Sequence, residues 1–340
     1  MKYYKNRLTH SGSLMILAFL LLIIIIFSIT LGRYPIGTRE AFGIIGSKLF
    51  DIDPFWTGTQ ESLLLNHRLP RVILACLVGC CLSTAGASYQ GVFQNAMAAP
   101  DILGASSGAA FGAALAILLD MGKTMIIVSA FSFSLLTVAL VIYIGHRVRG
   151  KQVLGLILAG IMISSLMSSG TSFIKLVADP ENQLPTITYW LMGSFNGASP
   201  EDVGFVVVPM AVGLAPLFLF RWRINVLTLG NDEARTMGVN AKRLRTIIIM
   251  CATLITAASV SVSGMIGWIG LVIPHLTRRL VGNNYKYLMP ATMVLGAIFL
   301  LVVDNISRNL LATEIPIGIL TSLIGVPFFI FLISRDGEQL

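Results

Sequence analysis

Apolar runs of about 20 residues recur along all 340 positions of this chain, and they restrict its fold more than any other feature. A run of this length crosses the hydrocarbon core of a bilayer, roughly 30 Å thick, as a single α-helix. Each backbone amide in that core must bond within its own helix, whereas strands of this length would leave open edges. Since 55% of the residues are hydrophobic and 12% are charged, we predict an all-α polytopic membrane protein.

The pattern predicts ten transmembrane helices in one domain that covers residues 1–340. The first run follows a basic leader but is too long for a signal peptide, and no small-x-small cleavage site follows it, so we expect a retained anchor. The expected spans cover about 14–31, 70–92, 102–120, 124–145, 152–175, 201–221, 244–265, 268–281, 287–307 and 315–334.

Basic residues indicate how these spans are oriented. If the N-terminus is cytoplasmic, 16 of the 24 Lys and Arg residues lie in cytoplasmic segments, as the positive-inside rule requires. The C-terminus is then cytoplasmic as well. This topology accounts for most of the net charge of +8, and no aromatic-interleaved basic patch calls for a nucleic-acid partner.

Motifs of catalysis are missing from the sequence. It contains no HExxH, GxSxG or Walker A pattern, and Gly122-Lys123-Thr124 has Ile117 where a phosphate-binding loop needs its first glycine. We therefore predict no catalytic residue, no bound cofactor, no metal site and no nucleotide hydrolysis by this chain. A metal or redox pair at Cys76 and Cys80 is the less favoured alternative to small apolar packing, which is also expected of the other cysteines, Cys81 and Cys251.

Two segments rich in Gly and Pro predict broken helices. One is AGASYQGVFQNAMAAPDILGASSGAAFG at 85–112, and the other is SGMIGWIGLVIPHLTR at 263–278. Unwound backbone is tolerated in a membrane only against protein or a watery cavity. Gln90 and Asn95, at the cytoplasmic end of the first segment, are candidates for a path or gate, whereas capping explains Asp101. The two segments would be crossed in opposite directions, which suggests inverted repeats of spans 2–5 and 7–10.

The most hydrophilic stretch, TLGNDEARTMGVNAKRLR at 228–245, is expected on the cytoplasmic side. Asn231 or Asp232 can cap a short helix, Glu233 suits its first turn, and Gly238 suits its left-handed end. Asn240 would then cap the next span. Such a helix, with Ala234 and Met237 on one side, predicts a docking element for a soluble partner, and a merely solvated loop is the alternative.

Taken together, these pieces resemble the FecCD family of ABC-transporter permeases, the type II importers of iron-siderophores, haem and cobalamin. The resemblance rests on segments that occur in family order. They are RLPR at 68–71, the two broken segments, LAG at 158–160, LGNDEARTMGV at 229–239 and DNISRNLLATEIPIGILTSLIGVPFFIFLI at 304–333. The sequence departs from the family at Ala96 and Met97, because the family usually has Pro-Leu-Ala after the asparagine.

The resemblance implies a role for each matching position. The coupling-helix loop, at about 222–243, would fit a cleft of the ATPase subunit through Gly230, Glu233, Ala234, Arg235, Met237 and Gly238. The gate would include Gln90, Asn95 and Met97. Arginines at the outer face would dock an external binding protein, unless they pair with Glu61 or Glu314 of the chain itself; these are Arg68, Arg71 and Arg308.

It also implies partners and a location. We expect a bacterial inner membrane, an ATPase dimer that uses ATP and Mg, a substrate-binding protein outside, and a second permease subunit, most simply an identical one. A ferric siderophore is the family's commonest cargo; haem, cobalamin and oxyanions stay open. His275 is expected to make a structural hydrogen bond rather than to ligate haem or metal. An ion-coupled secondary transporter and a signalling or scaffold protein remain the alternatives from other classes.

Overall fold

A computed structural model describes residues 10–51, 53–147 and 152–336, and every regular element in these ranges is helical. Seven of the described helices are long and apolar enough to cross a membrane. They are α1 (His10–Thr30), α4 (Leu69–Phe93), α6 (Lys123–Arg147), α7 (Gln152–Val177), α9 (Pro200–Leu219), α12 (Ala241–Ser263) and α14 (Tyr285–Asn309). The predicted all-α membrane fold is confirmed.

The other three predicted spans also coincide with helices, but they do not all reach the predicted length. These are α5 (Ala105–Leu118), α13 (Ile269–Val281) and α15 (Ile317–Asp336). Helix α5 has 14 residues and α13 has 13, fewer than a full span needs. Both follow an irregular segment, so part of the membrane depth is crossed there by non-helical chain. Such chain has to be shielded from lipid by the rest of the protein.

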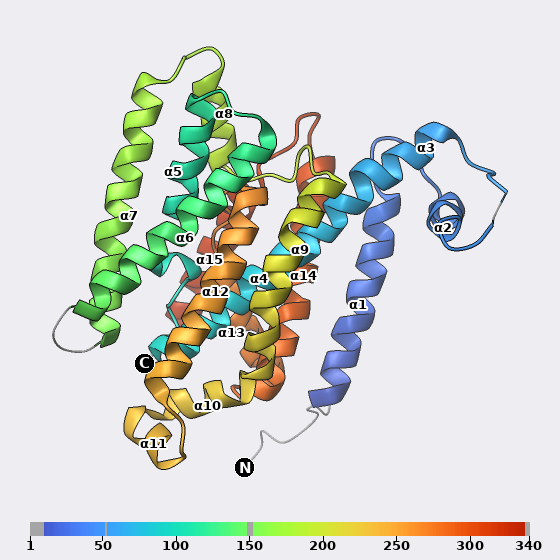
Figure 1. The fold of residues 1–340 in the computed structure, drawn as a ribbon. Coiled ribbons are helices and arrows are strands. Elements are labelled where there is room, and N and C mark those ends of the chain that lie inside the picture. The colour runs from blue at the N-terminus through green and yellow to red at the C-terminus, as the bar shows by residue number, and fades with distance from the viewer. Residues whose placement is uncertain (1–9, 52, 148–151, 337–340) are drawn as a thin grey trace.

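Short helices connect the long ones. On one side of the molecule are α2 (Thr38–Gly46), α3 (Gly58–Leu63) and α8 (Gln183–Leu191), and on the other are α10 (Arg221–Leu229) and α11 (Asn231–Thr236) (Figure 1). Helix α3 runs through a π-helical turn (Leu64–Arg68) into α4, and a 3₁₀ turn (Pro100–Leu103) precedes α5. The first residues of α1 lie toward the same end as α11 (Figure 1).

Helix α4 is the centre of the packing, since most of its side chains are buried. Glycines let its neighbours approach closely. A Cβ on Gly79 would lie 2.3 Å from the Gly296 oxygen of α14, and one on Gly86 would lie 1.9 Å from the Gly270 oxygen of α13. Helices in lipid have no hydrophobic driving force to associate, so such close backbone packing holds them together.

Two four-helix halves repeat the same order of lengths. Helices α4 to α7 have 25, 14, 25 and 26 residues, and α12 to α15 have 23, 13, 25 and 20. The first half enters from the side of α3 and the second from the side of α11, so the halves run in opposite directions (Figure 1). This is the inverted repeat predicted from the two glycine-rich segments.

Candidate functional site

The first break lies between α4 and α5. Gln94 ends α4 in the left-handed region at φ +50°, and Gly104 starts the chain into α5 at φ +77°. Gln94 Nε2 donates to the Leu227 oxygen of α10 at 2.7 Å, and the Met97 amide donates to Asn95 Oδ1 at 2.8 Å. These bonds fix a compact turn and tie it to the segment that leads to α11.

The three predicted gate residues do not come together in this conformation. Gln90 is 3% exposed, and its Nε2 donates to the Gly270 oxygen at 3.4 Å. Asn95 and Met97 lie at the surface instead, one and three residues beyond the left-handed Gln94. Gln90 therefore holds α4 against α13, while the other two side chains face outward from the first break.

The second break lies between α12 and α13 and meets the first. It begins at Gly264, φ +67°, and ends at Trp268, which adopts φ +70° although it is not a glycine. A Cβ on Gly270 would lie 2.5 Å from Cδ of Pro100. A narrow cavity between the breaks is lined by Pro100, Asp101, Ser106 and Trp268, among others. Irregular backbone from both halves thus meets at one place, as a gate would require.

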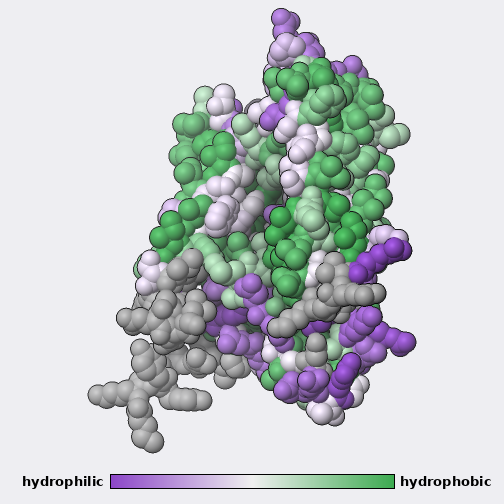
Figure 2. All heavy atoms as spheres, turned by 90° about the vertical axis from the view of Figure 1, so that its left-hand side faces the viewer, coloured by the Kyte–Doolittle hydropathy of each residue, from purple (hydrophilic) through white to green (hydrophobic). Residues whose placement is uncertain are grey.

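A polar stripe on α7 was missed in the sequence. Four serines of this helix, at spacings of three and four residues, are exposed side by side along it; they are Ser165, Ser168, Ser169 and Ser172. No charged residue occurs from Val153 to Ile174. Figure 2 faces the side on which α7 lies and shows pale residues crossing the apolar surface. The SSLMSSGTS sequence carried this signal, because hydroxyls at helical spacing share one face.

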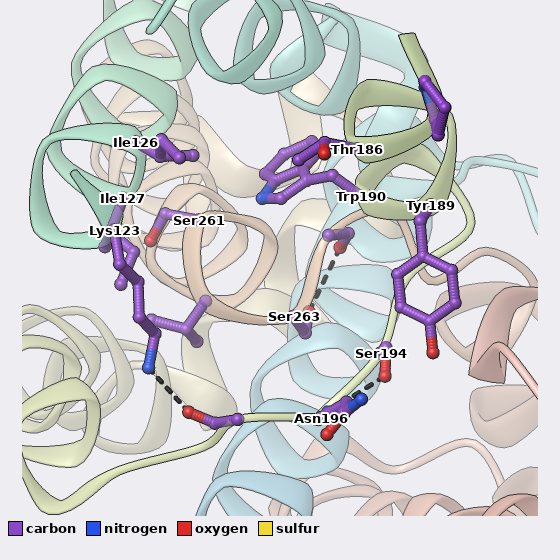
Figure 3. A pocket seen from close by; sticks show the side chains of 14 residues that line it. Lys123, Ile126, Ile127, Thr186, Tyr189, Trp190, Ser194, Asn196, Ser261 and Ser263 are labelled. Atoms are coloured by element: carbon purple, nitrogen blue, oxygen red, sulfur yellow. Dashed lines mark hydrogen bonds between the residues drawn. The ribbon is translucent and has the colours of Figure 1, made fainter. Parts of the chain in front are cut away.

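A cavity of about 600 Å³ lies between α6, α8, the loop at 194–197 and the end of α12 (Figure 3). Trp190 and Tyr189 supply much of its apolar lining. Lys123 Nζ donates to the Gly197 oxygen at 2.7 Å and to Asp202 Oδ2 at 2.5 Å, which closes one edge. The cavity lies at the opposite end of α12 from α11.

The short helix predicted in this hydrophilic stretch is present as α11, with two corrections to its details. Its N-cap position is Gly230, at φ +127°, and not Asn231 or Asp232, because the sharp turn out of α10 needs a backbone that only glycine adopts easily. Ala234 is fully buried against its own chain, whereas Met237 is 53% exposed, so the two do not share an exposed side.

Other details of this segment agree with the sequence. Gly238 adopts φ +73° just after the helix, as a left-handed terminator should. The Arg243 amide donates to Asn240 Oδ1 at 3.0 Å, so Asn240 caps α12. Glu233 and Arg235 are exposed. Two large apolar side chains that sequence reasoning missed, Trp222 and Leu229 of α10, are also mostly exposed at this end of the molecule.

The outer arginines are buried in contacts within the chain. Each is 8–9% exposed. Arg71 Nε donates to Asp304 Oδ1 at 2.9 Å, and its Nη1 donates to Glu314 Oε1 at 2.8 Å. The alternative of pairing with Glu314 is therefore confirmed for Arg71, whereas Glu61 pairs with Lys48 at 2.8 Å.

Arg68 and Arg308 donate hydrogen bonds to carbonyls at the C-terminal end of α1. Arg68 Nη1 donates to the carbonyls of Ile29 and Thr30 at 3.1 Å, and Arg308 Nη2 donates to the Ser28 carbonyl at 2.6 Å. Cations suit a helix C-terminus, where the last carbonyls lack partners in their own helix. In this conformation the three arginines join α1, α4, α14 and the loop before α15, and they do not stand free at the outer face.

Within the described ranges, no three His, Cys, Asp or Glu side chains come close enough together to hold a metal ion. His275 is half-buried and meets the ring of Phe329 edge-on, with 6.4 Å between centroids. Cys76 and Cys80 are both largely enclosed on α4.

Comparison with known proteins identifies the family, because the profile of the FecCD transport family matches residues 20–335. The chain belongs to the FecCD transport family. It is 39% identical over 326 residues to the molybdate import system permease of Haemophilus influenzae, covering 94% of this chain and 96% of that protein. It is 40% identical over 273 residues to a Helicobacter pylori protein named as an iron chelatin transport permease, covering 80% and 82%.

A solved structure agrees. The fold matches a chain of an ABC transporter assigned to the metal-chelate type and solved facing inward, with a TM-score of 0.85, 38% identity, and coverage of 95% of this chain and 98% of that one. This FecCD protein is therefore an integral membrane permease of an ABC importer.

Proposed function

We propose that this FecCD permease carries a ferric siderophore across a bacterial inner membrane, with both of its termini in the cytoplasm. The observation that carries the proposal is the exposed face of α7, which combines hydroxyls with apolar side chains and bears no fixed charge from Val153 to Ile174. Small hydroxyl side chains are enriched where a membrane helix meets other protein rather than lipid. A path with this lining would let a bulky chelate slide without holding it.

A second copy of the chain would complete the path. The exposed serines of α7 have no second wall in one subunit, and a two-fold axis beside α7 would set two such faces opposite each other. The breaks that meet near Pro100 and Gly270, with Gln90, Asn95 and Met97 around them, would open and close its cytoplasmic end.

Energy would come from a partner. The surface of α10 and α11 offers Trp222, Leu229 and Met237 as apolar contacts, with Arg235 beside them, to an ATPase dimer that binds ATP and Mg. Gly230 and Gly238 permit the tight turns on either side of α11, and Ala234 anchors it from within. Movement of the helix would then tilt the two subunits against each other. An external binding protein would deliver the chelate.

Uptake in cells that lack their own copy of this permease tests the lining of the path. Replacing Ser168 and Ser169 together with Leu should lower the initial rate of ⁵⁵Fe-siderophore uptake at least tenfold, because two bulky apolar groups would narrow and dry the path. Ser132→Leu, at an exposed serine of α6, is the matched control and should leave the rate unchanged. If the double variant and Ser132→Leu took up the siderophore at equal rates when equally expressed, the claim that α7 lines the path would be refuted.

Molybdate is the second candidate cargo, because the molybdate permease of Haemophilus influenzae is 39% identical over 94% of this chain. The same cells, given ⁹⁹Mo-molybdate, decide between the two. Uptake of molybdate that an excess of ferric siderophore does not reduce would replace the siderophore proposal and leave the path intact.

A further inference from the structure

The segment between α1 and α3 carries large apolar side chains in a place where no part of the described chain covers them. Leu49 is 80% exposed, Phe50 is 69% and Phe42 is 57%. Figure 1 shows α2 and its following loop beyond α1, at the level of the outer end of that helix rather than above it. The segment therefore extends sideways from the bundle.

This segment is ordered by its own contacts. Lys48 Nζ donates to Glu61 Oε1 at 2.8 Å, and Trp56 Nε1 donates to Glu61 Oε2 at 3.2 Å. Thr57 and Gln60 exchange hydrogen bonds in a capping box at the start of α3. These contacts fix the backbone around Leu49 and Phe50 so that both side chains stay exposed. In water, such exposure of large apolar side chains would be unfavourable.

The apolar groups share one face. Phe42, Ile45 and Leu49 follow each other at helical spacing along α2 and the turn after it. The other side of α2 is closed, because a Cβ on Gly43 would lie 2.6 Å from the Phe55 ring and 2.7 Å from the Trp56 ring. One face of helix α2 is therefore packed on aromatic rings, and a second, apolar face is left uncovered.

Helix α1, next to this face, has the smallest buried share of the seven described helices that are long and apolar enough to cross a membrane. Met15, Phe19 and Phe27 of α1 are all more than half exposed, and few of its residues are buried. The open face of α2 continues that apolar surface at its outer end. Aromatic residues that gather at one interface are typical of a membrane-water boundary. We propose that residues 38–51 and 53–56 form an interfacial anchor whose face of Phe42, Leu49 and Phe50 inserts into the outer leaflet.

The charges of this segment indicate whether electrostatic attraction or apolar insertion holds the anchor at the membrane. Residues 32–63 contain three basic side chains, Arg33, Arg39 and Lys48, and four acidic ones, Glu40, Asp51, Asp53 and Glu61. This near balance gives no net attraction to anionic headgroups. The apolar face alone drives insertion, and phosphatidylcholine serves as well as phosphatidylglycerol.

The experiment places a fluorescent NBD group on the full-length permease in nanodiscs that contain a lipid with a nitroxide near the top of its acyl chain. The probe is attached at Leu49→Cys or Phe50→Cys, with Thr59→Cys, an exposed position in α3, as the control. The unsubstituted protein, whose native cysteines are at least partly buried, gives the background of labelling. Quenching of the NBD fluorescence by the nitroxide should be at least twofold greater at residues 49 and 50 than at residue 59. It should be equal in nanodiscs of phosphatidylcholine and of phosphatidylglycerol.

Three results would overturn the proposal. Equal, weak quenching at all three positions would place the segment in water. Quenching that appears only with phosphatidylglycerol would show electrostatic attachment instead. Quenching that is weak in the free permease, with protection of residues 49 and 50 only when the binding protein is added, would make the face a protein docking surface.

Discussion

Replacement of Asp304 should cost this protein a large part of its stability. Its side chain is fully buried on α14, between Arg71 at 2.9 Å and Arg308 at 3.8 Å. Asp304→Asn keeps the shape and removes the charge, so two enclosed guanidinium groups lose their shared counterion. Breaking a buried pair by removing one partner typically costs about 3–5 kcal/mol. We expect about 3 kcal/mol here, because Asn retains one acceptor and Glu314 still pairs with Arg71.

Heating in detergent with a thiol-reactive dye measures this loss, since Cys76, Cys80, Cys81 and Cys251 lie within helices and become reactive on unfolding. A loss of about 3 kcal/mol should lower the melting temperature of a 340-residue chain by roughly 4 °C. Glu61→Gln is the matched control, because it removes the same charge from the exposed pair with Lys48, where water screens the interaction. The reasoning is refuted if Asp304→Asn melts with the parent protein, or if Glu61→Gln loses as much.

Two further substitutions test the packing and the capping. Gly86→Ala should destabilise the protein by about 1–3 kcal/mol, because the added methyl group would collide with the Gly270 oxygen. The control is Gly204→Ala, whose methyl group would meet nothing within 4 Å and should leave the stability unchanged. Thermal unfolding of the two variants makes the comparison. Asn240→Ala should lower stability by about 1 kcal/mol through loss of the cap on α12, and a melting curve that matches the parent's would contradict this.

Helix positions could be predicted because each apolar run has one solution in a bilayer. Every predicted span coincides with a helix, including the short α13, whereas α5 is shorter than the predicted span 102–120. Glycine and proline mark where a helix breaks, but how much of the membrane depth the broken chain covers depends on the neighbours that shield it. Only the fold brings Pro100 and Gly270 into contact.

The site was harder to predict than the fold. Arg71 finds its partners 233 and 243 residues away, and no local pattern shows which of several carboxylates it meets. The orientation of Ala234 follows from the turn at Gly230, because φ +127° sets the face that α11 turns inward. Helical spacing grouped Ala234 with Met237 on one side of α11, but it did not show that Ala234 would be covered by the rest of the chain.

Purification with the partner tests the central claim, that the α10–α11 surface couples this permease to an ATPase. Ala234 is buried, so its replacement could disturb the helix itself; the exposed Arg235 and Met237 are the sharper choices. The chain is tagged at its C-terminus and taken from its native membrane in mild detergent, and co-purifying proteins are identified by mass spectrometry. Lys286→Glu, an exposed charge reversal at the start of α14, is the control.

We predict that a Walker A ATPase accompanies the parent and Lys286→Glu proteins, and that Arg235→Glu with Met237→Glu reduces its recovery at least tenfold while the permease stays folded. Undiminished recovery with that double variant would contradict coupling through this surface. Recovery of no ATPase with an intact parent oligomer would contradict the ATP-driven account and return an ion-coupled carrier to consideration.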